Sequence, residues 1–492
     1  MDGLAELNPE IRNLIDGALV PASNGATFEN IDPSNEEVLG VCSDGTKDDM
    51  EAAIAAARRA FDESGWAQDP ALRSRCLTQF GEALQEAREE LRSIVVQEAG
   101  SPVLLTHFVQ TNQPIEDMAY WAKLAGGYAY EQNLSEMEIM GQPTNRILRR
   151  EPVGVVGAIT PWNFPFYLNL CKLGPALAAG NSVVLKPAPD TPWCATQIGR
   201  IIAEKTEIPA GVVNIVASSD HLLGEMLSSD PRVDLVTFTG STATGRRVME
   251  CASRTVKKIF LELGGKSANI VLDDANLEAV IGGVGATCTH AGQGCAIPTR
   301  LLLPRSRYEE GLELARASFE GVGYGDPRSP GNLQGPVISR KQQQRVLGYI
   351  EKGLQEGARL ITGGGVPAQF SKGYWVEPTV FADVDPAATI AQEEIFGPVL
   401  AVIPYDDDDD AVRIANHSIY GLSGSVSSGS DERALAVARR IRTGTLSING
   451  AQWFSVDTPF GGYRQSGIGR ESGVLGFEEY LETKVMALPV RG

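Results

Sequence analysis

The strongest constraint on the fold is a set of five short runs of apolar and β-branched residues, which recur about every 25 residues in the middle of the chain. The runs cover residues 153–159, 182–186, 212–216, 234–238 and 258–262. They are continuous rather than alternating in polarity, which is typical of strands that are buried on both faces. Helical segments separate them. The pattern therefore predicts an α/β fold with a doubly wound parallel sheet, in which ligands bind at the carboxyl ends of the strands.

A chain of 492 residues is too long for one hydrophobic core, so a second domain is expected. A second α/β series follows the first sheet. Its strands are expected near residues 268–272, 300–303, 399–403, 422–427 and 445–449. We assign residues 1–122 and 151–262 to the nucleotide-binding domain and residues 263–465 to the second domain. Residues 123–150 and 466–492 fit neither domain. They are predicted to form a small β segment for contacts between subunits, since unpaired strand edges are usually covered.

Local signals near the N-terminus predict one hairpin and two helices. Residues 14–20 are expected to form the hairpin. Thr46 followed three residues later by Asp49 is a capping box, in which each side chain accepts from the other residue's backbone, and it predicts a helix start. A second helix is expected to begin near Pro70. These helices have apolar residues at helical spacing and are predicted to be structural.

The charge composition disfavours some classes of partner. A net charge of −19 would repel nucleic acid and anionic membrane surfaces. The apolar runs are far shorter than the ~20 residues that a membrane-spanning helix needs. The N-terminus has neither the basic start nor the apolar centre of a signal peptide, so a cytoplasmic location is expected.

Neither disulfides nor a metal site are predicted. The seven cysteines are odd in number and include no CxxC pair. Five successive aspartates at 406–410 lack the alternating spacing and the glycine of a calcium loop. They directly precede a helical pattern, and the helix dipole favours acids at that end. The acidic run is therefore interpreted as the start of a helix.

The stretch from Glu262 to Cys295 carries the clearest chemistry. Glu262 is followed by Leu-Gly-Gly-Lys-Ser, and Cys295 follows Gly-Gln-Gly. A cysteine acts as a nucleophile in its thiolate form, so we expect a cationic or dipolar neighbour that lowers its pKa. The Cys295 amide is placed to donate to an oxyanion. A cysteine hydrolase is an alternative, with His290 as the sole local histidine candidate.

Two further segments lie at the ends of predicted strands, where such sheets bind ligands. The first is Thr-Pro-Trp-Asn-Phe-Pro at 160–165, in which Asn163 offers an amide donor and Trp162 a packing surface. The second runs from Gly240 to Gly245 and opens a helix, so its backbone amides and the Ser241 hydroxyl suit a phosphate group. It matches neither GxGxxG nor a P-loop.

Taken together, these segments resemble the NAD(P)-dependent aldehyde dehydrogenases over nearly the whole chain. The matching motifs occur in the family's order and are Pro-Trp-Asn-Phe-Pro at 161–165, Lys-Pro at 186–187, Phe-Thr-Gly-Ser-Thr at 238–242 with Gly245, Glu-Leu-Gly-Gly-Lys-Ser at 262–267, Gly-Gln-Gly-Cys at 292–295, Glu-Glu-Ile-Phe-Gly-Pro-Val at 393–399, and Pro-Phe-Gly-Gly at 459–462 continuing to Ser-Gly at 466–467.

The resemblance implies an α/β cofactor domain, a second α/β catalytic domain and a small β oligomerisation segment. It also implies catalytic roles for Cys295 as nucleophile, Glu262 as the base for the deacylating water, Asn163 with the Cys295 amide as the oxyanion hole, and Lys172 in proton relay. The implied cofactor-binding residues are Thr160, Trp162, Lys186, Gly240, Ser241, Gly245, Leu263, Glu394 and Phe396. The implied reaction oxidises an aldehyde to an acid through a thiohemiacetal and a thioester. The implied assembly is a homodimer or homotetramer.

The chain departs from the family pattern near the first ribose site and near the nucleophile. Pro189 replaces a glutamate that is common in NAD-preferring members, and Asp190 follows it. A carboxylate at this site repels a 2′-phosphate. Pro189 has none, but the adjacent Asp190 can take the role, so NAD is favoured over NADP. His290 stands where many members have asparagine. The turn after the third strand, at 217–220, lacks the family's glycine and leaves the shape of the adenine pocket open.

The resemblance also implies which residues line the aldehyde tunnel, namely Phe166, Tyr167, Leu170, Cys171, Gly294, Ala296, Trp453 and Phe460. They are mostly apolar and include no Lys or Arg, so a neutral or apolar aldehyde is expected rather than a semialdehyde acid. Two alternatives to a hydrolytic enzyme remain open. One is a CoA-acylating relative, which typically lacks the glutamate at 262, and the other is a non-catalytic protein on the same fold.

Overall fold

The five runs that dominate the sequence form the parallel centre of an eight-stranded sheet in the computed structural model, which describes residues 4–490. The strand order is β19-β11-β10-β7-β8-β9-β1-β2. The bounds are β1 (Asn13–Ile15), β2 (Ala18–Val20), β7 (Val155–Ile159), β8 (Ser182–Lys186), β9 (Val213–Ile215), β10 (Leu235–Thr239), β11 (Lys258–Glu262) and β19 (Gly467–Ile468). Strands β7 to β11 run parallel, whereas β1, β2 and β19 are antiparallel additions at the edges. The predicted α/β class is confirmed.

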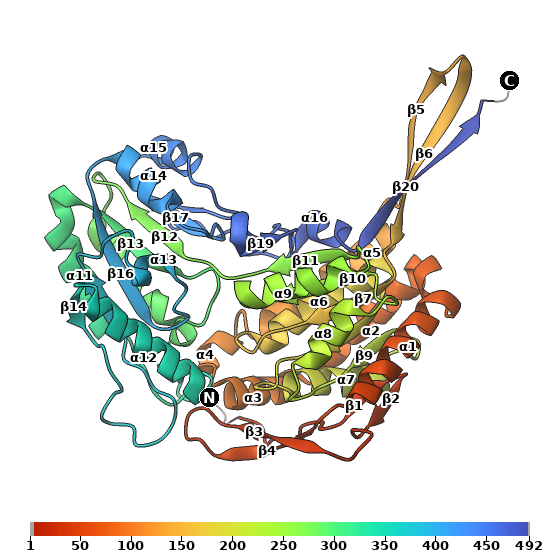
Figure 1. Ribbon diagram of the computed structural model, residues 1–492, viewed down its shortest axis with the longest axis horizontal. Helices are drawn as coiled ribbons and strands as arrows, with labels where there is room; N and C mark the ends of the chain where they lie inside the picture. Colours follow the sequence, from red (N-terminus) through yellow and green to blue (C-terminus); the bar gives the residue numbers. More distant parts are fainter. Residues whose placement is uncertain (1–3, 491–492) are drawn as a thin grey trace.

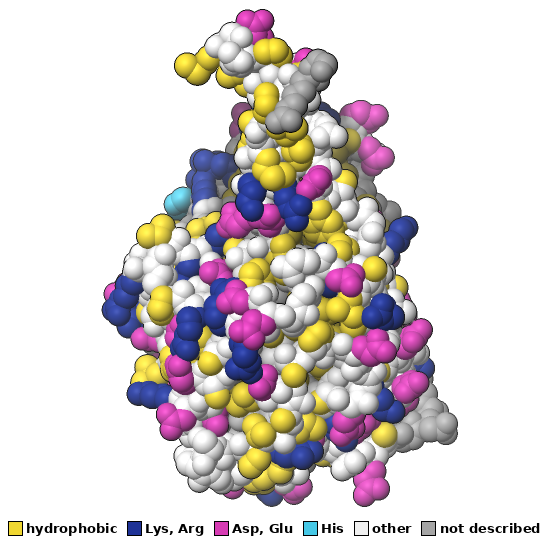
Figure 2. Space-filling model, turned by 90° about the vertical axis from the view of Figure 1, so that its right-hand side faces the viewer, with side chains coloured by type: hydrophobic (Ala, Val, Ile, Leu, Met, Phe, Trp, Pro, Cys, Tyr) yellow, Lys and Arg dark blue, Asp and Glu magenta, His cyan; other side chains and the backbone are white. Residues whose placement is uncertain are grey.

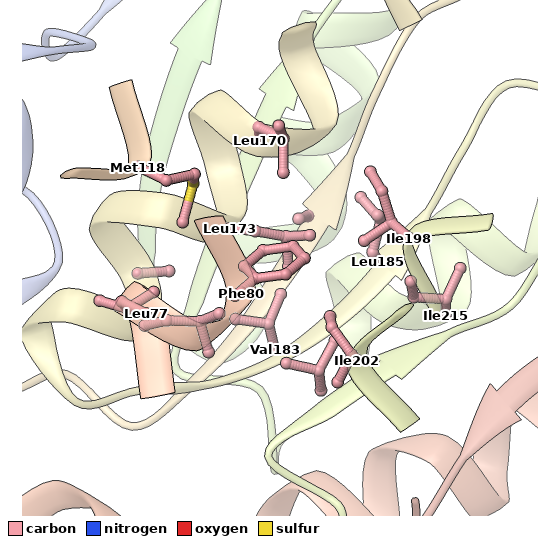
Figure 3. Close-up of a cluster of buried hydrophobic side chains, with 14 of the residues drawn as sticks. Leu77, Phe80, Met118, Leu170, Leu173, Val183, Leu185, Ile198, Ile202 and Ile215 are labelled. Carbon is pink, nitrogen blue, oxygen red and sulfur yellow. The ribbon is translucent and has the colours of Figure 1, made fainter. Parts of the chain in front are cut away.

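Helices cover both faces of this sheet (Figure 1). One face packs against α1 (Lys47–Glu63), α8 (Leu222–Ser229) and α9 (Thr242–Ser253), and the other against α2 (Pro70–Glu86), α5 (Asn112–Gly127), α6 (Pro165–Ala179) and α7 (Trp193–Lys205). Within β8, Val183 and Leu185 face one set of helices and Val184 faces the other. Figure 3 shows the core on the face covered by α2, α5, α6 and α7, with Phe80 among the labelled residues. Double-sided burial explains why the strands lack polar alternation.

The local predictions near the N-terminus are confirmed. Residues 13–20 form the β1–β2 hairpin. Thr46 caps α1, and both hydrogen bonds of its capping box with Asp49 are present. Helix α2 begins at Pro70. The remaining elements of this region are β3 (Thr27–Ile31), β4 (Val38–Ser43), α3 (Arg88–Ala99) and α4 (Val103–Thr106).

The second body is built on a seven-stranded sheet with the order β14-β15-β16-β13-β12-β17-β18. Its strands are β12 (Ser267–Val271), β13 (Pro298–Pro304), β14 (Arg359–Thr362), β15 (Thr379–Ala382), β16 (Val399–Tyr405), β17 (Gly424–Ser427) and β18 (Ser447–Ile448). Its helices are α10 (Leu277–Ile281), α11 (Tyr308–Glu320), α12 (Arg340–Gln355), α13 (Thr389–Gln392), α14 (Asp408–Asn416) and α15 (Asp431–Ala438). Strands β14 and β15 were not predicted.

The predicted small β segment projects from the larger body as an arm (Figures 1 and 2). It is an antiparallel sheet of β20 (Leu481–Pro489), β6 (Gln142–Pro152) and β5 (Glu131–Ile139). The segment that forms this arm is shorter than the predicted residues 123–150 and 466–492. Helix α5 crosses residue 122 and packs on α2 and α6, while β19 and α16 (Gly473–Glu478) pack against the larger body. Residues 466–480 are therefore outside the arm.

The acidic run starts a helix, as its position before a helical pattern indicates. Asp407 caps α14 by accepting a hydrogen bond from the Asp410 amide at 2.9 Å. Within residues 4–490, no group of His, Cys, Asp and Glu side chains is arranged to hold a metal ion. No helix in the same range is long and apolar enough to cross a membrane.

Candidate active site

A cavity of about 880 Å³ lies where the two bodies meet. The larger body contributes Trp162 and Asn163 after β7, Gly240 and Ser241 after β10, and Glu262 at the end of β11. The second body contributes Cys295, Glu394 and Phe396 from loops, and Gln342 and Arg345 from α12. The strand ends of the parallel sheet therefore form one wall of the cavity, as expected for a doubly wound fold.

Glu262 and Cys295 lie together in this cavity. The Glu262 side chain is only 2% exposed, and its Oε1 has no hydrogen-bond partner among the described residues. Burial raises its pKa well above the usual range, while the Lys172 charge and a hydrogen bond with the Cys295 thiol act in the opposite direction. A buried carboxyl group of this kind suits a proton acceptor that works near neutral pH.

Burial raises the pKa of the Cys295 thiol, and the carboxylates of Glu262, Glu394 and Glu471 raise it further. The backbone amide of Cys295 acts in the opposite direction, as the predicted dipolar neighbour would, but it does not outweigh burial and the carboxylates. The thiol is held protonated until a base accepts its proton.

The loop that presents Cys295 has an unusual backbone. His290, Ala291 and Gly292 have φ angles of +50°, +55° and +71°. A side chain at Gly292 would overlap the Gly397 carbonyl, so the close approach requires glycine. Gln293 is fully buried, and its Oε1 accepts from the Ile338 amide at 2.9 Å. These contacts fix the backbone on the N-terminal side of the nucleophile.

Asn163 lies against the same loop. Its Nδ2 donates to the Gln293 carbonyl at 2.9 Å, although 130 residues separate them in the sequence. The side-chain amide has two N–H groups, so one remains for a ligand. Asn163 lines the cavity beside Cys295, as the oxyanion role requires.

His290 packs as a neutral core side chain. It is fully buried, its ring lies edge-on to Phe164 at 5.6 Å, and neither nitrogen has a hydrogen-bond partner among the described residues. Burial lowers its pKa to about 4. It does not line the cavity, so the geometry disfavours the cysteine–histidine hydrolase.

Helix α9 directs its N-terminus at the cavity. Ser241 caps the helix by accepting from the Thr244 amide at 3.2 Å, and Gly240, Ser241 and Leu263 line the cavity. Gly245 does not line it. A Cβ at Gly245 would come within 2.6 Å of Leu263, so this glycine allows close packing of α9 rather than contact with a ligand.

Two predicted cofactor residues lie behind the cavity wall. The Thr160 hydroxyl donates to Asn169 at 2.6 Å and is buried, so the side chain does not reach the cavity. Lys186 is also buried, and its Nζ donates to the Pro187 carbonyl at 3.5 Å. Burial lowers the pKa of Lys186 to about 8, whereas Asp220 and Asp44 act to raise it.

Glu394 and Phe396 line the cavity from the side of the second body. Glu394 Oε1 accepts from the Gly265 amide at 3.0 Å, and a side chain at Gly264 would overlap this carboxylate. Burial raises the pKa of Glu394 to about 7. Phe396 has a φ of +60°, and its ring lies edge-on to Trp162 at 5.5 Å.

The similarity to known proteins extends over nearly the whole chain. Residues 19–486 match the aldehyde dehydrogenase family. A 3-succinoylsemialdehyde-pyridine dehydrogenase from a Pseudomonas species is 43% identical over 476 residues, which is 96% of this chain and 97% of that protein. The chain belongs to the aldehyde dehydrogenase family.

Solved structures of aldehyde dehydrogenases have the same fold. A Mycobacterium tuberculosis aldehyde dehydrogenase complexed with NAD+ is 40% identical, with a TM-score of 0.94 and coverage of 98% of this chain and 99% of that one. A Pseudomonas syringae enzyme complexed with NAD+ and octanal is 37% identical, with a TM-score of 0.92 and 98% coverage of each chain. The recognition from sequence motifs is therefore confirmed.

The cavity of this aldehyde dehydrogenase is aromatic on the side where the family resemblance predicts the aldehyde tunnel. Tyr167 and Phe454 have ring centroids 5.6 Å apart, and Trp453 and Phe460 lie parallel at 5.4 Å. Of the predicted tunnel residues, Tyr167, Gly294, Ala296, Trp453 and Phe460 line the cavity. Phe166, Leu170 and Cys171 do not. Phe166 and Leu170 belong instead to the core that contains Phe80, in which Figure 3 labels Leu170.

The sequence reasoning missed Glu471. This buried carboxylate lines the cavity and forms an ion pair with Lys172, whose ammonium also lies 4.7 Å from the Phe260 ring centroid. The partners are 299 residues apart. The only available signal was the acid in Gly469-Arg470-Glu471, directly after the last recognised motif.

The cavity fits a dinucleotide cofactor by the chemistry of its walls. The α9 N-terminus offers backbone donors for a diphosphate, and Glu394 offers a partly buried carboxylate for ribose hydroxyls. Lys186, with Asp44 and Asp220 near it, lies behind the cavity wall near the end of β8.

Proposed function

We propose that this aldehyde dehydrogenase oxidises an aldehyde to the carboxylic acid with NAD, through a covalent intermediate on Cys295. The observation that carries the proposal is the convergence of Cys295, Glu262 and Asn163 in one cavity with the cofactor groove. The bound dinucleotide would supply the hydride acceptor, which the side chains cannot provide. Trp162, Ser241 and Glu394 would hold it.

The residues around Cys295 support a two-stage reaction. In the first stage the Cys295 thiol gives its proton to solvent, the thiolate attacks the aldehyde carbon, and Asn163 Nδ2 and the Cys295 amide stabilise the oxyanion. After the hydride leaves to the bound dinucleotide, a thioester to Cys295 remains. In the second stage Glu262 accepts a proton from water as that water attacks the thioester carbon, the carbon–sulfur bond breaks, and the leaving thiolate takes that proton from Glu262, so that the acid and the free thiol are released.

Lys172 is proposed to assist Glu262 in proton relay. Its charge lowers the pKa of Glu262 against the effect of burial, and its ammonium pairs with Glu471, which also lines the cavity. Glu262 therefore lies near both an acidic and a basic buried group. Lys172 and Glu471 can therefore help to move the proton that Glu262 takes from water, without exposing the thioester to bulk solvent.

NAD is proposed as the preferred cofactor, and several carboxylates around the first ribose site support it. Asp190 lies on the cavity wall, and Asp44 and Asp220 are close enough to Lys186 to raise its pKa. These acids would repel a 2′-phosphate even though Pro189 replaces the family's glutamate. The ratio of NAD to NADP dissociation constants, measured by tryptophan quenching, tests this, and tighter binding of NADP would contradict it.

A neutral or apolar aldehyde is proposed as the substrate. Among the described residues that line the cavity, the basic ones are Lys341 and Arg345, and both belong to α12 beside the cofactor groove. The aldehyde side has aromatic rings and no positive partner for a second carboxylate. A panel of aldehydes of graded length and charge, ranked by kcat/KM, should favour uncharged members; a preference for semialdehyde acids would contradict the assignment.

The arm is proposed to join copies of the chain into a homodimer or homotetramer. Met137, Val485 and Leu488 are exposed apolar residues on its strands. Figure 2 shows hydrophobic side chains along this projection. Light scattering after size-exclusion chromatography should give a mass of two or four chains, and Val485→Lys should shift it downward if the arm forms the contact.

A Glu262→Gln variant tests the proposed second stage. It should release one burst of NADH per site and then turn over slowly, because acylation remains while water activation is lost. A general base typically contributes ~10²–10⁴ in rate. An unchanged steady-state rate would remove Glu262 as the base. A requirement of the wild-type enzyme for CoA would favour the CoA-acylating alternative.

A further inference from the structure

One face of α12 holds the segment that carries Glu394 and Phe396. We call residues 393–397 the ribose segment. Gln342, Arg345 and Tyr349 are spaced by three and four residues, so their side chains lie on one face of the helix. Each of them makes a hydrogen bond to the ribose segment.

The contacts to the backbone of the ribose segment are successive. Gln342 Nε2 donates to the Phe396 carbonyl at 2.8 Å. Arg345 Nη2 donates to the Glu394 carbonyl at 2.7 Å, and its Nε reaches the Ile395 carbonyl at 3.4 Å. Side chains of α12 therefore occupy the carbonyls of three consecutive residues.

The ribose segment needs such support because it is not part of a helix or strand. It lies between α13, which ends at Gln392, and β16, which begins at Val399. Phe396 has a positive φ of +60°, which is costly for a bulky residue unless surrounding contacts hold it. Gly397 is pressed against Val346 of the same helix.

Tyr349 connects the side-chain and backbone contacts while remaining outside the cavity. Its hydroxyl donates to Glu393 Oε2 at 2.7 Å and accepts from Arg345 Nη2 at 3.3 Å. The Arg345 guanidinium lies 5.1 Å from the Tyr349 ring centroid. Gln342 and Arg345 line the cavity, whereas Tyr349 does not. Its effect on a bound ligand must therefore pass through the residues that it holds.

We propose that Tyr349, acting through Glu393 and Arg345, is a positioning residue that holds Glu394 and Phe396 in the geometry needed at the nicotinamide end of the cofactor. The proposal rests on the proposed function, because it requires the dinucleotide to lie in this cavity. The adenine end lies against the other body and is independent of these contacts. Loosening the ribose segment should therefore weaken one end of the cofactor site and spare the other.

Tyr349→Phe is the direct test, because it removes one hydroxyl that does not reach the cavity. In the enzyme without cofactor, backbone amides in the peptide covering 393–399 should exchange with deuterium faster. The dissociation constant for NAD, measured by calorimetry, should rise about 3- to 10-fold, as for loss of one hydrogen bond. The dissociation constant for ADP, which probes only the adenine end, should stay within about twofold.

A kinetic test separates positioning from a general loss of stability. With an aldehyde deuterated at its carbonyl carbon, Tyr349→Phe should show a larger isotope effect on kcat than the wild type, because misplacement slows the hydride step. Glu393→Gln keeps an oxygen that can accept the Tyr349 hydroxyl and should behave close to wild type. Tyr308→Phe is the matched control, since its hydroxyl binds the Asp383 amide at 2.7 Å, away from the ribose segment.

The outcomes distinguish the two proposals. Unchanged exchange and unchanged NAD affinity in Tyr349→Phe would overturn the positioning role, as would an equal loss of NAD and ADP affinity. If the wild type bound no dinucleotide while the exchange difference was still present, the proposed function would fail rather than the contact network. Equal effects in Tyr308→Phe would also overturn it, because a distant hydroxyl would then suffice.

Discussion

Removing the Asn163 side chain should damage the reaction far more than the fold. Its Nδ2 makes one hydrogen bond, to the Gln293 carbonyl at 2.9 Å, and such a bond is worth ~1 kcal/mol in net stability. The second N–H is available to the oxyanion, and loss of one oxyanion donor typically costs ~10²–10³ in rate, or ~2.7–4 kcal/mol. Asn163→Ala should therefore lower the acylation rate by ~10²–10³ and the free energy of unfolding by only ~1 kcal/mol.

Stopped-flow measurement of the NADH burst gives the acylation rate, and urea unfolding gives the stability. Asn169→Ala is a matched control on α6, because its buried Oδ1 accepts from the Thr160 hydroxyl at 2.6 Å and it does not line the cavity. That variant should lose stability without a comparable loss of rate. The reasoning is refuted if Asn163→Ala folds normally and acylates within about tenfold of the wild type.

Three further predictions concern charge and packing. Burial raises the Glu394 pKa to about 7, so the carboxylate becomes protonated below that pH. The affinity for NAD should therefore fall by up to about tenfold per pH unit below about pH 7, and it should not depend on pH in Glu394→Gln. Calorimetry from about pH 6 to 8 measures this slope, and an affinity that rises as the pH falls would contradict the prediction. Phe80→Ala should cost ~3–5 kcal/mol in urea unfolding, whereas Phe108→Ala, at an exposed site, should cost less than ~0.5 kcal/mol; equal losses would contradict the core assignment. Lys172→Met should lower the free energy of unfolding by ~3–5 kcal/mol, because it leaves the Glu471 carboxylate unpaired. Adding Glu471→Leu should restore stability. If it does not, the loss in Lys172→Met does not come from breaking this ion pair.

Local patterns predicted much of the fold because they report burial over short distances. The strands β7 to β11, the capping box at Thr46 and the helix start at Asp407 follow from residues within a few positions of each other. Short or edge elements were less predictable. Strands β14 and β15 have four residues each, and β19 has two. Strands as short as β9 and β17 were predicted, so length alone does not explain these misses; pairing with neighbouring strands decides the conformation of such segments.

The errors at the site have a common origin in the direction of side chains. Phe166, Leu170 and Tyr167 lie within two turns of α6, but only Tyr167 reaches the cavity. The net direction of the Cys295 pKa shift was also not predictable, because the charges that raise this pKa come from Glu262, Glu394 and Glu471 on separate elements. A sequence motif identifies a reactive group without specifying the neighbours that determine its pKa.

The sequence by itself determined the chemical parts of this aldehyde dehydrogenase: the thiol of Cys295, the carboxylate of Glu262, the amide of Asn163, and the parallel strands whose ends bring ligand-binding groups to one edge. Those features depend on residue type and short-range periodicity. Only the tertiary structure decided that Asn163 contacts the loop of Cys295 across 130 residues and that Lys172 pairs with Glu471 across 299. Such pairings follow from the packing of whole bodies, because burial requires each charged or polar group to find a partner wherever the chain brings one within reach.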